Sequence, residues 1–106
     1  MVTTDQLITL SRRIAEGLPE VTRNEWMRWM QVAEKYGLER AIHYAERLSR
    51  DVTIRPAIQR ANRLIARSVS AHLRALQRIG AKERRMIFGY VAWLLQISTL
   101  RGSLKG

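Results

Sequence analysis

The sequence contains no cysteine and only two prolines. Without cysteine the chain cannot form a disulfide scaffold, a thiolate zinc site or a cysteine nucleophile, and an intracellular origin is expected. Residues 1–5 hold no basic or apolar segment of the kind that opens a secretory signal. The longest apolar stretch, residues 86–95, is much shorter than the roughly 18 residues that a membrane span needs. These absences predict a soluble, cytoplasmic protein with no membrane partner.

Acidic residues are scarce in the second half of the chain. The 106 residues include 19 Lys and Arg against nine Asp and Glu, which gives a net charge of +10. Residues 1–51 hold eight basic and eight acidic side chains, whereas residues 52–106 hold 11 basic side chains and one acid, Glu83. The excess charge therefore lies in an arginine-rich second half, and a polyanion such as nucleic acid is the expected partner.

The sequence also offers little for catalysis or for binding a cofactor. It holds no glycine-rich phosphate loop, no His and carboxylate at metal-ligand spacing, and no Ser, His and Asp arrangement. His43 and His72 lie on different predicted helices, and His72 falls on the apolar side of its helix, which is typical of a histidine at the edge of a core. We therefore expect no catalytic residue, no metal site and no cofactor, and hence a protein that is not an enzyme.

Apolar residues recur at helical spacing along the chain, and no segment alternates for long enough to predict a strand. The predicted fold is all-α, a compact bundle of about five helices that forms a single domain over residues 1–106. Thr22 and Glu25 have the spacing of a capping box, and Pro56 follows a linker at residues 51–55. The predicted helices cover about residues 4–16, 22–36, 38–50, 56–79 and 82–100. Their predicted ends are Gly17, Gly37, Gly80 and Gly102.

The last predicted helix is apolar on nearly all sides over residues 86–95, so we expect it to be the centre of the core. The aromatic residues are expected to fill that core rather than to stack on bases. Trp26 has an alternative role as a partner contact, because it lies within one turn of its helix start. The expected core aromatics are Trp26, Trp29, Phe88, Tyr90 and Trp93.

Five arginines share a narrow face of the predicted helix 56–79. At 100° per residue they occupy an arc of about 60° over a length of about 27 Å, opposite the apolar residues of the same helix. No acidic residue lies on this helix, although a solvated face normally mixes both signs because like charges at helical contact spacing repel. Arginine also suits bidentate contact with phosphate. We call this row the arginine ridge; its members are Arg60, Arg63, Arg67, Arg74 and Arg78.

Positive charge continues around the last helix, at Lys82, Arg84 and Arg85 and later at Arg101 and Lys105. The arginine ridge with Lys82, Arg84 and Arg85 is the predicted nucleic-acid-binding site, and single-stranded RNA or DNA is the predicted ligand. Carboxylates from the first half of the chain or from another subunit are the alternative partners for the ridge. A ridge of this length meets only a few phosphates, so useful affinity would need several copies of the protein.

A different DNA-binding arrangement is suggested by residues 32–41, VAEKYGLERA, which resemble the middle of a helix-turn-helix motif. The following positions differ, because His43 and Glu46 stand where that motif places inward apolar residues. The helix that would enter the groove also carries Glu39 and Glu46, which disfavour phosphate. A helix-turn-helix regulator is one alternative, and a binding module for an acidic protein is another.

Two segments resemble the small helical subunits of CRISPR effector complexes. These are YGLERAIHY at residues 36–44, which opens a helix, and FGYVAWLL at residues 88–95 in the last helix. The resemblance implies a non-catalytic subunit of an antiviral ribonucleoprotein complex, present in several copies beside the other subunits. Residues 74–81, RALQRIGA, resemble a stretch of the helical coat proteins of rod-shaped archaeal viruses, which implies a nucleocapsid protein that wraps nucleic acid as the alternative.

Overall fold

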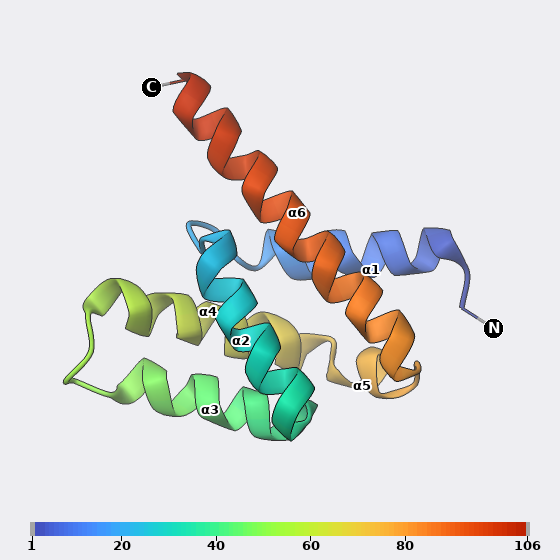
Figure 1. The fold of residues 1–106 in the computed structure, drawn as a ribbon, viewed down its shortest axis with the longest axis horizontal. Helices are drawn as coiled ribbons and strands as arrows, with labels where there is room; N and C mark the ends of the chain where they lie inside the picture. Colours follow the sequence, from blue (N-terminus) through green and yellow to red (C-terminus); the bar gives the residue numbers. More distant parts are fainter. Residues whose placement is uncertain (1, 106) are drawn as a thin grey trace.

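The computed structural model describes residues 2–105, with side chains placed through residue 98 (Figure 1). Over these residues the chain forms six helices: α1 (Thr4–Glu16), α2 (Arg23–Tyr36), α3 (Leu38–Arg50), α4 (Pro56–Ala71), α5 (Leu73–Gln77) and α6 (Ala81–Lys105). Residues 2–105 contain no strand, so the all-α prediction is confirmed. The molecule is a compact helical globule of 42 × 35 × 20 Å. The side chains of Arg101 and Lys105 lie outside the described part.

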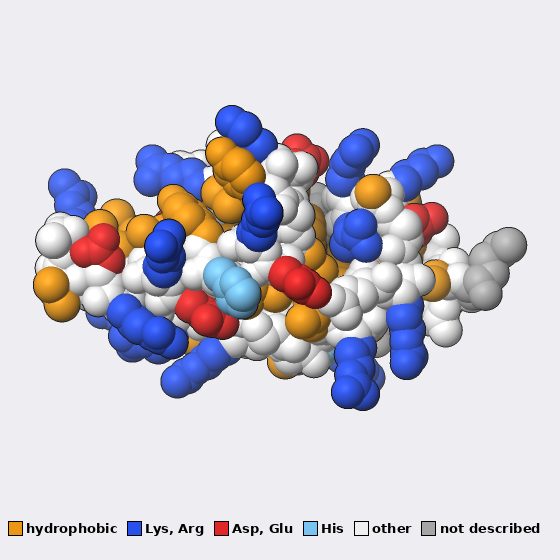
Figure 2. Space-filling view, turned by 90° about the horizontal axis from the view of Figure 1, so that it is seen from below, with side chains coloured by type: hydrophobic (Ala, Val, Ile, Leu, Met, Phe, Trp, Pro, Cys, Tyr) orange, Lys and Arg blue, Asp and Glu red, His pale blue; other side chains and the backbone are white. Residues whose placement is uncertain are grey.

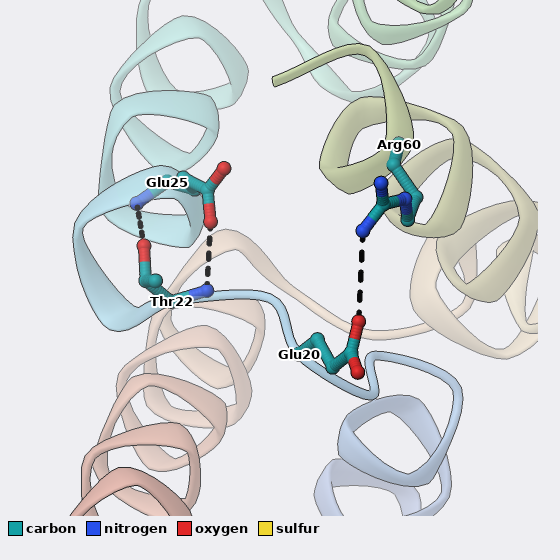
Figure 3. Close-up of polar contacts among 4 residues, drawn as sticks. All are labelled: Glu20, Thr22, Glu25 and Arg60. Atoms are coloured by element: carbon teal, nitrogen blue, oxygen red, sulfur yellow. Dashed lines mark hydrogen bonds and ion pairs between the residues drawn. The ribbon is translucent and has the colours of Figure 1, made fainter. Parts of the chain in front are cut away.

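Local sequence signals set the helix ends in the first half. The predicted capping box at α2 is confirmed: Thr22 Oγ1 accepts from the Glu25 N–H at 3.2 Å, and Glu25 Oε1 accepts from the Thr22 N–H at 2.9 Å (Figure 3). Thr3 and Gln6 form the same arrangement at α1. Gly37 has φ 94°, a conformation that residues with a side chain rarely adopt, so α2 ends there and α3 begins directly after it.

Two helix pairs organise the fold. α3 packs along α4, and α6 crosses α1 at an angle and packs on it, while α2 contacts both α3 and α6 (Figure 1). The predicted linker before Pro56 is confirmed as the turn that lets α4 run back along α3. The result is that charged faces of α3 and α4 come to lie on one side of the molecule.

Two tryptophans of α2 form the centre of the core. Trp26 and Trp29 are 0% and 1% exposed, so Trp26 is a core residue and not a partner contact. The Trp26 Nε1–H donates to the carbonyl of Phe88 at 2.9 Å, and the Trp29 Nε1–H donates to the carbonyl of Ala41 at 2.9 Å. The Phe88 ring packs edge-on against both indoles, with centroids 5.6 and 5.4 Å away. With their polar N–H groups satisfied, these rings hold α2, α3 and α6 together.

The prediction that the last helix is the centre of the core is wrong. The side of α6 that carries Phe88 and Val91 is buried on α1 and α2, but Trp93 is 52% exposed and Tyr90 is only partly buried. The helix also continues past its predicted end at Gly102, and its C-terminal turns project beyond the other helices (Figure 1). A helix that is apolar on all sides therefore leaves one apolar side open to solvent.

The predicted helix 56–79 is broken in two at His72. The His72 backbone has φ −117° and ψ 17°, so α4 ends at Ala71 and α5 begins at Leu73. This break makes the five-helix count wrong, and no glycine or proline marks it in the sequence. Leu76 on α5 is in the core with 0% exposure.

Candidate nucleic-acid interface

The break at His72 divides the predicted arginine ridge between two helices. Arg60, Arg63 and Arg67 lie on α4, whereas Arg74 lies on α5 and Arg78 directly follows it. All five side chains are exposed, but they do not form one row on one helix. On the face shown in Figure 2, Lys and Arg side chains are spread around the periphery, with acidic side chains and a histidine between them.

Two of the predicted site residues face carboxylates from the first half of the chain. Arg60 Nη1 lies 3.7 Å from Glu20 Oε2 (Figure 3), and Arg85 Nε lies 3.8 Å from Glu34 Oε1. Partners from the first half, the alternative considered for the ridge, are thus present for Arg60. All four side chains are more than half exposed, so each pair stabilises the fold by at most about 1 kcal/mol.

Arg84 has a structural role. Its Nη1 group donates to the carbonyls of Leu76 at 3.1 Å and Ile79 at 2.8 Å. These carbonyls lie at the C-terminal end of α5, where the helix leaves acceptors without a helical N–H partner. Arg84 therefore closes α5 from the first turn of α6, and its guanidinium is only partly exposed.

The remaining predicted cations outside α4 are separated from one another. Arg78 lines an open groove between α1 and α5, beside Asp5 and Arg13. Arg74 and Lys82 are exposed on α5 and at the start of α6. Arg63 and Arg67 do not line the groove of Arg78, and neither Arg74 nor Lys82 lines the groove of Arg63 and Arg67.

Arg63 and Arg67 line an open groove of about 370 Å³ between α3 and α4. Arg50, the last residue of α3, faces them from the other side of the groove. Within the described side chains, none of these three arginines has a carboxylate within ion-pair distance. The polar residues that line the α3–α4 groove are Glu46, Ser49, Arg50, Arg63, Arg67 and Ser70. Two helices thus bring three guanidinium groups and a single carboxylate to one groove.

The basic surface continues from this groove onto α3. Arg40, His43 and Arg47 precede Arg50 at intervals of three or four residues, which places them on one side of the helix. They line a second, shallow groove, and Glu46 and Arg50 line both grooves, so the two are contiguous. We call this region the α3–α4 basic surface; its members are Arg40, His43, Arg47, Arg50, Arg63 and Arg67.

The predicted site did not include the α3 cations. Charge summed over residues 1–51 is zero because acids such as Glu39 and Glu46 offset the arginines of the same helix. In the fold, Glu39 accepts a hydrogen bond from Gln77 Nε2 at 3.0 Å and so joins α3 to α5. The spacing of Arg40, His43, Arg47 and Arg50 along the predicted helix 38–50 is the signal that would have identified them.

The turn between α3 and α4 is held by Asp51. Its carboxylate accepts hydrogen bonds from the Thr53 N–H at 2.9 Å and from the Thr53 hydroxyl, and both lower the pKa of Asp51 below its usual value. The Asp51 carbonyl accepts from Gln59 Nε2 on α4. These contacts fix the end of α3 against the start of α4, which sets Arg50 across the groove from Arg63.

The described side chains contain no group of three or more His, Asp or Glu residues placed to hold a metal ion. Likewise, none of the helices in residues 2–105 combines the length and the hydropathy that a membrane-spanning helix requires. Comparisons of the chain with models of protein families, with curated proteins and with solved structures find no match. Within the described residues, the α3–α4 basic surface is the feature with the strongest bearing on function.

Proposed function

We propose that the protein binds the phosphate backbone of single-stranded RNA or DNA through the α3–α4 basic surface, as a non-catalytic subunit of a nucleoprotein assembly. The observation that carries the proposal is the α3–α4 groove, in which Arg50, Arg63 and Arg67 face one another with no carboxylate in ion-pair distance among the described side chains. Guanidinium groups bind phosphate oxygens in pairs and stay charged at every physiological pH. A phosphate in the groove would relieve the repulsion between the three.

The chemistry of the surface favours backbone contacts over base reading. Most hydrogen bonds from proteins to nucleic acids go to phosphate and sugar, and the two grooves lack the Asn and Gln side chains that pair with adenine. Tyr44, which is 42% exposed, is the aromatic residue that lines the α3 groove, and it offers one face on which a base can stack. We therefore expect binding with little sequence preference.

The small size of the surface favours action in several copies. Arg40 and Arg50 are ten residues apart on α3, or about 15 Å along the helix, which is enough for only a few phosphates. One copy then binds weakly, and neighbouring copies on the same strand would raise the overall affinity. We propose that the assembly is a CRISPR effector complex, in which the chain would be the small subunit. A viral nucleocapsid is the alternative.

The helix-turn-helix alternative uses the same helix, because α3 would be its recognition helix and exposes Arg40 and His43. The connection differs, since α2 and α3 are joined by Gly37 alone, whereas the motif uses a turn of three to four residues. A footprint on one specific duplex that is lost in Arg40→Gln would favour this alternative.

Titration of oligo-uridine and oligo-thymidine at increasing salt concentration tests the proposal. With about five phosphates contacted, log K should fall with log salt at a slope of about −3.5 for a single strand. Replacing Arg50, Arg63 and Arg67 together by Gln should reduce the steepness by about 2 and weaken binding strongly at low salt.

A charge-matched variant provides the control for this experiment. Replacing Arg60, Arg74 and Lys82 by Gln removes the same charge from outside the α3–α4 groove. We expect this control to keep most of the slope and the affinity, because Arg60 already faces Glu20 and neither Arg74 nor Lys82 lines the α3–α4 groove. Equal losses in the two triple variants would show that overall charge, and not the groove, controls binding.

A further inference from the structure

A second apolar side of α6 is left uncovered by the described part of the chain. Met86 and Trp93 are 53% and 52% exposed, and Tyr90 and Ile97 are partly exposed. At 100° per residue these four residues lie within about 60° of one another, opposite the buried side that carries Val91. The rings of Tyr90 and Trp93 contact each other with centroids 5.4 Å apart, which supports the indole in its exposed position. We call these four residues the α6 stripe.

Gly89 lies beside Trp93 on this exposed side, and nothing within the molecule requires a glycine there. Glycine in the interior of a helix is less favourable than alanine. A Cβ atom built at Gly89 meets nothing within 4 Å beyond its own stretch of helix, and its φ is not in the left-handed range. The absence of a side chain at Gly89, next to the exposed indole of Trp93, leaves room for another molecule to approach the helix closely.

The distribution of charge favours a second copy of the chain as the molecule that covers the α6 stripe. Each copy of the chain carries +10, so most of its surface repels a second copy. Residues 86–100 contain no charged residue, and before them Arg85 faces Glu34. The stretch that carries the α6 stripe is thus free of charge, so two copies that meet over it bring cations together only at its ends, at Lys82 and Arg101. An acidic partner would instead gain from the cationic surfaces elsewhere on the molecule.

Nucleobases are the other ligand that exposed aromatic rings commonly accept. Sites of that kind place Arg or Lys beside the rings, where they hold the phosphates of the stacked nucleotides. Residues 86–100 contain neither, and the nearest cation before them on this side of α6, Lys82, lies 11 residues, or about 16 Å, from Trp93 along the helix. The α6 stripe therefore suits a protein surface better than a nucleic acid.

We infer that two copies of the chain associate through their α6 stripes, in antiparallel directions, with Trp93 of each copy over Gly89 of the other. A two-fold axis near residue 91 produces both contacts at once, since positions 89 and 93 are equally far from it. A large side chain then fills the space left by a missing one, as in packed helix pairs. The inference deepens the proposed function and rests on it for the requirement that several copies act together.

Sedimentation equilibrium of the full chain, free of nucleic acid and at high salt, tests the inference. The wild-type protein should show a monomer–dimer equilibrium, and Trp93→Gln should raise the dimer dissociation constant by roughly tenfold or more. Gly89→Ala should also raise it, because the new methyl group occupies the space for the indole. In dilute solution, however, Gly89→Ala should unfold at a higher temperature than wild type, because alanine favours the helix. These opposite changes in one variant separate docking from loss of folding.

Two controls complete the test. Val52→Ser replaces a side chain that is 89% exposed in the turn between α3 and α4, and it should leave self-association unchanged. The triple Gln variant at Arg50, Arg63 and Arg67 should still form dimers, so that loss of nucleic-acid binding and loss of self-association are read separately.

Three results would overturn the inference. One is wild-type protein that sediments as a monomer at every concentration. Another is Gly89→Ala protein that associates as tightly as wild type. The third is Trp93→Gln protein that loses affinity for oligo-uridine while its self-association is unchanged, which would assign the α6 stripe to nucleobases.

Discussion

α4 and α6 both belong to the basic half of the chain, yet they present opposite chemistry to solvent. The outward side of α4 carries Arg63 and Arg67, whereas the outward side of α6 carries Met86 and Trp93 with no charge among residues 86–100. Each helix uses its other side to build the core. The positive charge of this half therefore lies on the exposed side of α4, whereas the exposed side of α6 is apolar. Because the two surfaces differ in this way, we assign a different partner to each.

The basic half also contains cations that stabilise the fold and do not face a ligand. Among the single substitutions we expect the largest loss of stability at Arg84. Arg84→Gln should lower the free energy of unfolding by about 1–2 kcal/mol, because the carbonyls of Leu76 and Ile79 lose a charged donor. For a domain of this size, 1 kcal/mol corresponds to a shift of about 4–8 °C in Tm. Thermal unfolding followed by circular dichroism measures this shift.

Arg63→Gln is the matched variant, since it removes the same charge from an exposed position on α4. Its stability should stay within about 0.5 kcal/mol of wild type, while its affinity for oligo-uridine falls. If Arg63→Gln destabilised the protein as much as Arg84→Gln, the distinction between a ligand-facing and a fold-supporting arginine would not hold.

Salt should act in opposite directions on the two surfaces, with an effect of intermediate size. Higher salt weakens phosphate binding to the α3–α4 basic surface because counterions compete. The same salt should strengthen self-association through the α6 stripe, because it screens the repulsion between two copies of charge +10. Binding of oligo-uridine and sedimentation measured over one salt series test this difference. A dimer whose dissociation constant rises with salt would contradict an apolar contact through the α6 stripe.

The smallest expected effect concerns Asp51, whose turn holds α3 against α4. Hydrogen bonds from Thr53 lower the pKa of the Asp51 carboxyl in the folded protein, so this carboxylate contributes stability above its unfolded pKa. That contribution is lost as the pH falls through the folded pKa. Thr53→Val should therefore lower Tm slightly at neutral pH, and the difference from wild type should shrink in acid. A difference that grows in acid would contradict this role for the turn.

The extent to which the sequence predicts the fold depends on how local the controlling interactions are. The capping box of Thr22 and Glu25, the end of α2 at Gly37 and the turn before Pro56 all act within a few residues, and all were predicted. The break at His72 has no such local signal, because no glycine or proline marks it and a continuous helix would also place Leu76 on the buried side with Ile65 and Val69. Only long-range packing shows that this helix cannot continue.

The candidate site follows the same rule. Arg63 and Arg67 were predicted from spacing on one helix, and the structure places both on the exposed side of α4. Arg50 joins them only because the turn at Asp51 folds α3 back along α4, which is a tertiary relation. Trp93 was expected in the core because its helix is apolar on all sides, but the other helices cover only one of those sides.

The distribution of the tryptophans gives the protein a built-in optical label. Two of its three indoles, Trp26 and Trp29, are buried and hydrogen-bonded to carbonyls, while Trp93 is half exposed to solvent. Acrylamide should therefore quench the emission of Trp93 selectively, and shielding of Trp93 should report contact with α6 without any attached dye. Emission from the two buried indoles then reports, in the same cuvette, whether α2 still joins α3 to α6.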